Sequence, residues 1–204
     1  MKAPRIRRIA LIAALILIVF VAFFYSVYRP WQLSWGATAD EVVRPMVGDG
    51  LVKNPTFNAT RAVTVNAAAE RIWPWIVQMG YKRAGFYSWD ILDNDGIPSA
   101  EEILPEYQNL KIGDSLPLGE YTDAEVVDLV PNSRLLLVFQ SGGTVTWAWG
   151  LYKIDAERTR LVTRLRWRNT NVVSQFALDA FEIVMMRKCL LGIKRRAEAQ
   201  TQLI

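Results

Sequence analysis

The sequence contains no histidine, and this absence limits the chemistry that the protein can perform. A Ser–His–Asp or Cys–His nucleophile needs an imidazole as its base, and the common zinc sites use imidazole as a ligand. The single cysteine, Cys189, lies in an apolar stretch, where a buried and unreactive thiol is expected. No Walker A loop and no dinucleotide-binding glycine pattern occurs. We therefore predict no catalytic residue and no cofactor, although acid–base chemistry by Asp, Glu, Tyr or Lys in a dry cavity stays open.

The acidic segment DNDG at 93–96 resembles part of a calcium-binding loop, and Glu102 follows the glycine by six positions. In an EF-hand loop of that register the first position is acidic, but here it is Ile91. A polar turn explains the segment equally well. We therefore predict no metal site.

Large apolar side chains alternate along two neighbouring runs of strand-like sequence. Trp147 and Trp149 share one face of the first run, and Leu165 and Trp167 share one face of the second. Paired as a hairpin, the two faces form an apolar wall. This wall either packs as core or lines a ligand cavity, and the sequence leaves both interpretations open. These four residues are our first candidates for ligand binding.

Arg83 and Tyr87 are the other two candidates, because they lie in an irregular segment where loops at a cavity mouth tend to carry function. A guanidinium at such a mouth can bind the carboxylate or phosphate end of an amphipathic ligand through two hydrogen bonds. The alternative is an ion pair between Arg83 and Asp90 that only stabilises the segment.

Four further arginines lie on the face of these runs opposite the apolar wall: Arg160, Arg164, Arg166 and Arg168. A solvent-exposed sheet face, with acids such as Glu125 or Asp128 nearby, is the interpretation that we favour. Binding of anionic lipid headgroups is the alternative.

Residues 9–28 form an uncharged apolar run, long enough to cross the roughly 30 Å hydrocarbon core of a membrane as a helix. A cleaved signal peptide is the alternative, although its apolar part is normally only about 7–15 residues long. Residues 1–8 are basic, and few basic residues follow the run. The positive-inside rule therefore predicts a single-pass protein with a cytoplasmic N-terminus and an extracytoplasmic domain.

The net charge of +4 comes from the four cations within residues 1–8, so the rest of the chain is formally neutral. A nucleic-acid-binding domain usually carries a basic excess of its own, and we therefore expect no nucleic-acid partner. Residues 29–57 resemble a tether, with a short helix predicted by the capping box at 38–41. The oligomeric state is not indicated by any feature of the sequence.

The remaining elements predict an α+β domain over residues 58–200. A strand at 59–66 leads into a helix over 67–79, capped by Asn66 and bent at Pro74. An irregular segment follows, with a short helix opened by a capping box at 99–102. Strands are then expected at 121–130, 133–140, 144–154 and 160–168, and a long helix at 175–200. The apolar stripe expected on this helix is Leu178, Phe181, Met185, Cys189 and Gly192.

Several segments resemble the START-like superfamily, which includes polyketide cyclase/dehydrase-type and lipid-transfer domains, and in particular its bacterial membrane-anchored members. The resemblance covers about residues 35–200 and is carried by the segments at 35–38, 60–80, 83–94, 103–114 and 182–198. It implies a helix-grip fold, in which a curved antiparallel sheet wraps a long C-terminal helix. It also implies a cavity for a hydrophobic molecule, but no particular reaction.

Three functions follow from these observations. The first is a membrane-tethered domain that binds a small hydrophobic or amphipathic ligand, such as a lipid, an isoprenoid or an aromatic metabolite. The second is a cyclase- or dehydratase-type enzyme that uses cavity carboxylates or tyrosines. The third is a structural extracytoplasmic domain with a filled core. A buried, unpaired carboxylate in the cavity distinguishes the second from the first.

Overall fold

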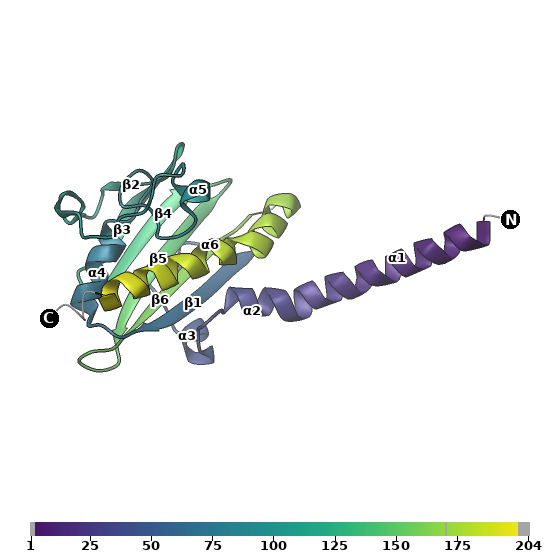
Figure 1. Cartoon of the computed structure of the whole chain (residues 1–204), viewed down its shortest axis with the longest axis horizontal. Helices are drawn as coiled ribbons and strands as arrows, with labels where there is room; N and C mark the ends of the chain where they lie inside the picture. The colour runs from purple at the N-terminus through teal and green to yellow at the C-terminus, as the bar shows by residue number, and fades with distance from the viewer. Residues whose placement is uncertain (1–2, 170, 200–204) are drawn as a thin grey trace.

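The computed structural model describes residues 3–169 and 171–199 of the chain. Helix α1 (Ala3–Phe23) continues through a π-helical turn, η1 (Phe24–Tyr28), into α2 (Arg29–Leu33). Figure 1 shows this continuous helix projecting away from the rest of the molecule. Its length and composition suffice to cross a membrane, although an N-terminal signal sequence meets the same description.

A short helix, α3 (Ala39–Val43), follows α2 and begins at the predicted capping box. The Glu41 N–H donates to the Thr38 hydroxyl over 3.2 Å, and the Glu41 carboxylate accepts from the Thr38 N–H over 2.8 Å. The two bonds satisfy donors that the first turn of a helix leaves free. This prediction is confirmed.

Six antiparallel strands form one sheet in the order β1-β6-β5-β4-β3-β2. Their bounds are β1 (Phe57–Val65), β2 (Ser115–Gly119), β3 (Thr122–Val130), β4 (Arg134–Gln140), β5 (Thr144–Lys153) and β6 (Thr159–Trp167). The four-stranded meander is confirmed, and β1 adds to its β6 edge. Strand β2 was not predicted, because its five residues include a proline and two positions that favour turns.

The chain between β1 and β3 departs from two predicted helix starts. Helix α4 (Ala69–Val77) contains Pro74, as expected, but begins after Ala68 without a side-chain cap, so the prediction that Asn66 caps it is wrong. The capping box at 99–102 is also wrong, because the Ser99 hydroxyl accepts the Tyr87 N–H instead of capping a helix. Short helices form at α5 (Asp90–Asp93) and at η2 (Pro105–Tyr107).

Helix α6 (Val172–Ala199) lies along the sheet, as Figure 1 shows. Its buried face contains Asp179, Ile183, Met186, Cys189, Leu190, Ile193 and Ala197. The predicted stripe is wrong in its first half, because Phe181 is 66% exposed. The buried face of α6 includes Asp179. A prediction from apolar residues alone excludes an aspartate from the buried face and therefore places that face incorrectly. With α6 on one side of a curved antiparallel sheet, the fold is of helix-grip type.

The opposite side of the sheet is covered by the tether, so the prediction of a solvated arginine face is wrong. Arg164 is only 3% exposed and donates to the Asp49 carboxylate over 2.7 Å and to the carbonyls of Glu41 and Val42. Arg160 pairs with the Glu41 carboxylate in the same way. These arginines therefore fasten the tether to the sheet, and only Arg168 of the four is exposed.

Candidate functional site

A cavity of about 190 Å³ lies between the sheet and α6. Its lining is Phe86, Ser88, Asp93, Leu118, Phe139, Trp147, Leu165, Glu182, Met185, Met186 and Cys189. Strands β4, β5 and β6 supply the wall, and α6 supplies the opposite side. The half-buried members of the lining, among them Asp93, Phe139 and Met185, mark the side on which the cavity opens.

Two of the four predicted wall residues line this cavity. Trp147 and Leu165 are direct cross-strand partners on β5 and β6, and both face the cavity. Trp149 is fully buried beside Trp147, with ring centroids 5.1 Å apart, and belongs to the core outside the lining. Trp167, at the end of β6, is partly exposed and also lies outside the lining. One wall thus serves both as core and as cavity surface.

Arg83 and Tyr87 lie outside the lining, and their polar groups have other partners. The Arg83 guanidinium donates to the Val77 carbonyl over 3.1 Å and lies 4.7 Å from the centre of the Tyr107 ring. The Tyr87 hydroxyl donates to the Trp75 carbonyl over 2.9 Å. Both contacts fix the irregular segment to neighbouring backbone and rings.

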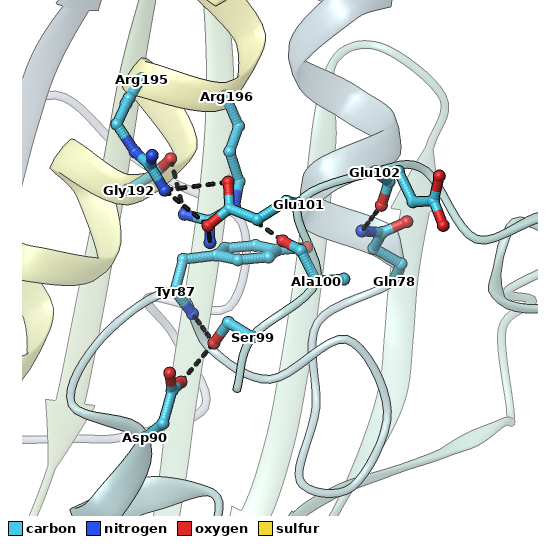
Figure 2. A network of polar contacts seen from close by, with 10 residues as sticks. All are labelled: Gln78, Tyr87, Asp90, Ser99, Ala100, Glu101, Glu102, Gly192, Arg195 and Arg196. Carbon is cyan, nitrogen blue, oxygen red and sulfur yellow. Dashed lines mark hydrogen bonds and ion pairs between the residues drawn. The ribbon is translucent and has the colours of Figure 1, made fainter. Parts of the chain in front are cut away.

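The predicted alternative for Arg83, an ion pair with Asp90, is not the arrangement found. Asp90 accepts a hydrogen bond from the Ser99 hydroxyl, which itself accepts the Tyr87 N–H. Figure 2 shows this chain of contacts and, above the Tyr87 ring, the Arg196 side chain. The Arg196 guanidinium lies 4.5 Å from the ring centre and pairs with Glu101. The network joins the irregular segment to the C-terminal half of α6.

Two carboxyl groups in the cavity were not selected from the sequence: Asp93 and Glu182. Asp93 ends α5, and its Oδ1 is buried without a hydrogen-bond partner among the residues described. Burial raises the pKa of Asp93 to about 6, and nearby Asp90 adds to the rise, while Ser88 and Lys188 act against it. At neutral pH this carboxyl is mostly ionised, but it accepts a proton far more readily than an exposed aspartate.

Glu182 projects from α6 and forms an ion pair with Arg61 of β1, whose Nη1 lies 2.5 Å from Glu182 Oε2. The Arg61 side chain is 1% exposed and that of Glu182 is 13% exposed. Burial raises the pKa of Glu182, and the guanidinium opposes that rise. In the sequence, Glu182 stands out only as the single acid inside the apolar segment around 181–186.

Arg61 also connects the cavity to the N-terminal helix. Its Nε donates to the Gln32 carbonyl over 2.8 Å, and its Nη2 donates to the Gln32 side-chain oxygen over 2.6 Å. On the same surface, Arg29 forms an ion pair with Asp179 of α6 over 2.8 Å. Helix α2 is thus held to β1 and α6 by buried charged groups.

The remaining polar groups of the lining are less suited to chemistry. Burial raises the pKa of the Cys189 thiol, which keeps the thiol protonated. The Ser88 hydroxyl donates to the Met185 carbonyl over 3.0 Å. Within residues 3–169 and 171–199, no group of three or more His, Cys, Asp or Glu side chains is placed to hold a metal ion.

No family model and no curated protein matches the sequence. Among solved structures, the fold is similar to DynU16, a protein in the dynemicin biosynthetic locus, with 18% identity and a TM-score of 0.45 over 67% of this chain. The chain spans about half of DynU16, covering 47% of its length.

Two further solved structures are similar over most of their own length. The Polyketide_cyc-like protein Cgl2372 from Corynebacterium glutamicum is 16% identical, with a TM-score of 0.39 over 72% of this chain and 94% of its own. Aha1 from Colwellia psychrerythraea is 14% identical, with a TM-score of 0.43 over 69% of this chain and 96% of its own. Similarity at this level carries no argument about a ligand or a reaction. The helix-grip assignment therefore rests on the strand order and on the position of α6 across the sheet.

Proposed function

We propose that this protein binds a small hydrophobic or amphipathic molecule in the cavity between the sheet and α6, beside a membrane that α1 crosses. The observation that carries the proposal is the lining itself, in which Trp147 and Leu165 of the sheet face Met185 and Met186 of α6. Apolar surface of this kind gains free energy when a ligand removes it from water. A structural domain with a filled core is disfavoured, because such a core leaves no cavity.

The cavity volume limits the size of the ligand. Ligand sites typically measure roughly 300–1,000 Å³, whereas this cavity measures about 190 Å³. It therefore suits a molecule with one ring, or one end of a longer lipid or isoprenoid whose remainder leaves through the open side. In this proposal residues 9–28 span the membrane, and the domain over 58–200 contains the site.

Contacts between the N-terminal helix and α6 support a site near the membrane. The Tyr28 hydroxyl donates to the Ala180 carbonyl over 2.6 Å, and the Phe24 ring lies 5.2 Å from that of Phe176. The start of α6 therefore lies beside the last turns of the apolar helix. Val173 and Phe181 on α6 are 79% and 66% exposed, which favours contact with a membrane surface. The basic residues before the helix favour a cytoplasmic N-terminus and an extracytoplasmic domain.

Filling the cavity tests the binding site. The full chain is reconstituted in phosphatidylcholine nanodiscs and titrated with 2-phenylethanol, a neutral molecule with one ring, by isothermal calorimetry against empty nanodiscs. Leu165→Trp places a larger side chain in the lining, and we expect the affinity to fall by about tenfold or more, since part of the buried contact is lost. Ile154→Trp adds the same side chain at an exposed position and leaves the affinity unchanged. If Leu165→Trp and the wild type bind 2-phenylethanol with equal affinity, the cavity is not the binding site.

The unpaired carboxyl of Asp93 favours a second candidate, an acid–base enzyme of cyclase or dehydratase type. A half-buried carboxyl whose pKa is about 6 is matched to proton transfer near neutral pH. Mass spectrometry of the small molecules that co-purify with the wild type and with Asp93→Asn distinguishes the two functions. An enzyme without its base retains an unconverted substrate, so the two proteins carry different molecules. A binding domain carries the same compound in both.

A further inference from the structure

The two ionisable carboxyl groups of the cavity give its lining a negative charge and no positive one. Asp93 enters from the end of α5 and Glu182 from α6, and among the lining residues that the structure describes none is basic. Arg61, which pairs with the lining residue Glu182, also donates to Gln32 and lies outside the lining. The Lys188 ammonium also lies outside the lining, 3.7 Å from the centre of the Trp89 ring.

Asp93 is the lining carboxyl whose charge no ion pair opposes among the described residues. Its Oδ1 and the oxygens of Glu182 are buried without a hydrogen-bond partner there, but Arg61 forms an ion pair with Glu182. A buried acceptor without a donor is costly, and a ligand that supplies a donor removes that cost. A cationic donor adds Coulombic attraction in surroundings that exclude most water.

The aromatic part of the lining attracts the same kind of ligand. Phe86 and Trp147 lie with ring centroids 6.4 Å apart, and Phe139 completes the aromatic surface. The faces of such rings carry partial negative charge and favour a cation over an anion. Methionine sulfur and aliphatic groups in the rest of the lining accept the uncharged part of the ligand.

We infer that the cavity selects its ligand by charge: it accepts an apolar molecule that carries an amine or a similar cationic donor, and it rejects a carboxylate or a phosphate. The inference rests on the proposed function, because it names the chemical class of ligand for the same cavity. It replaces the expectation that Arg83 holds an anionic end, since Arg83 donates to the Val77 carbonyl outside the lining.

Protonation of Asp93 gives the inference a pH dependence. Ser88, Asp90 and Lys188 are close to this carboxyl, and Cys189 and Glu182 share the cavity with it. The pKa of about 6 means that a proton competes with a bound amine below that pH. Amine affinity therefore rises as the pH increases through about 6, while the affinity for a neutral alcohol stays constant.

The test compares three probes of one size: 2-phenylethylamine, 2-phenylethanol and phenylacetate. Each is titrated into the full chain in zwitterionic phosphatidylcholine nanodiscs at about pH 7.5, where Asp93 is ionised and the amine is protonated. We expect the amine to bind about tenfold more tightly than the alcohol, which corresponds to one charge-assisted hydrogen bond. Phenylacetate is expected to bind more weakly than the alcohol, because Asp93 repels it.

Variants and pH assign the preference to Asp93. Asp93→Asn brings the amine and the alcohol to similar affinities, while alcohol binding remains and shows that the cavity is intact. Asp95→Asn removes the same charge at an exposed position two residues away, outside the lining, and keeps the preference. On the wild type, lowering the pH to about 5 removes the preference without any substitution.

The outcomes separate this inference from the proposed function. If the alcohol binds but the amine shows no preference, or if Asp93→Asn keeps the preference, the charge selectivity is overturned and the cavity remains a binding site. If phenylacetate binds as tightly as the amine, the selectivity is likewise overturned. If none of the three probes binds, the proposed function fails, and the inference fails with it.

Discussion

At the scale of single residues, the domain buries several charged groups, and each is buried for a different reason. Arg61 and Glu182 neutralise one another, whereas Arg164 is surrounded by carbonyl oxygens and Asp49. Asp93 faces the cavity with an oxygen that lacks a hydrogen-bond partner, and among the described residues it has no ion pair of the kind that Arg61 provides for Glu182. Such a group lowers the stability of the free protein, and its retention is understandable if a ligand uses it.

The stability of the domain is expected to depend on pH through Asp93. Its folded-state pKa of about 6 lies above the ordinary value of 3.8, so the ionised carboxyl destabilises the native state above that range. Asp93→Asn should therefore raise the melting temperature at about pH 8, and the gain should shrink as the pH falls through about 6 and vanish near about 4. Differential scanning fluorimetry across this range measures the gain.

Asp95 is the matched control, because the shift of its pKa has the opposite sign to that of Asp93. Hydrogen bonds from Tyr81 and Lys82 hold the pKa of Asp95 below its ordinary value, so this carboxylate favours the folded state above its unfolded pKa and loses that contribution as the pH falls. Asp95→Asn should therefore give no increase in melting temperature at about pH 8. A gain from Asp93→Asn that does not change with pH would contradict the assignment.

At the scale of secondary-structure elements, the tether is part of the folded domain. Its α3 helix begins at a complete capping box, and the chain from Glu41 to Asp49 supplies the oxygens that bind Arg164. The outer face of β6 therefore pairs with a segment more than one hundred positions earlier in the chain. The tether both covers the sheet and fixes the point at which the N-terminal helix leaves the domain.

Removing the Arg164 guanidinium should weaken the attachment of the tether to the sheet. Arg164→Met keeps the apolar stem but leaves three carbonyls without this donor and leaves Asp49 with only Arg166 as an ion-pair partner among the described residues, and we expect a loss of roughly 3–5 kcal/mol in the free energy of unfolding. Trypsin should then cleave faster after Arg44 and Lys53, which limited proteolysis measures. Arg168→Met, at an exposed position directly after the end of β6, should change stability by no more than about 0.5 kcal/mol. Unchanged cleavage in Arg164→Met would show that the tether is held by other contacts.

At the scale of the whole molecule, the N-terminal helix is joined to the domain by side-chain contacts of its last turns. The helix runs unbroken from α1 through α2, and Gln32 and Arg29 bind Arg61 and Asp179 of the domain. The same Arg61 pairs with Glu182 in the cavity lining. A chain of buried polar contacts therefore extends from the N-terminal helix to the cavity.

A fragment that begins at Trp35 should be less stable than one that begins at Arg29. The shorter fragment lacks Gln32 and Arg29, so Arg61 loses two acceptors and Asp179 loses its partner. We expect a difference of roughly 2–5 kcal/mol in the free energy of unfolding, measured with urea in the same detergent.

A control assigns the loss to these two side chains. In the longer fragment, Arg29→Ala and Gln32→Ala together remove most of the same contacts while keeping the helical turns. The free energy of unfolding of this variant should be close to that of the shorter fragment. If the two fragments unfold at the same urea concentration, then α2 contributes nothing to the domain.

The sequence by itself determined the elements whose signal is local. The uncharged run at 9–28, the alternation along the four strands of the meander and the capping box at 38–41 each depend on residues a few positions apart. Period and capping chemistry act within one element, so the helix over 9–28, the strands and the capping box were confirmed, while the membrane span itself stays a prediction. The helix-grip fold followed from their order and from the resemblance of the segments between 35 and 200.

Only the tertiary structure decided which polar residues are buried. Arg164 and Asp179 lie on faces that hydropathy assigns to solvent, because partners distant in the sequence neutralise them. The same cause misplaced the apolar stripe of α6 and left Glu182 unnoticed as a cavity residue. Ser99 met the pattern of a helix cap, yet it bonds to Tyr87 and Asp90, which lie 12 and 9 positions earlier in the same irregular segment. Burial of charge depends on long-range pairing, which no local pattern records, and for that reason the cavity and Asp93 emerged only from the folded chain.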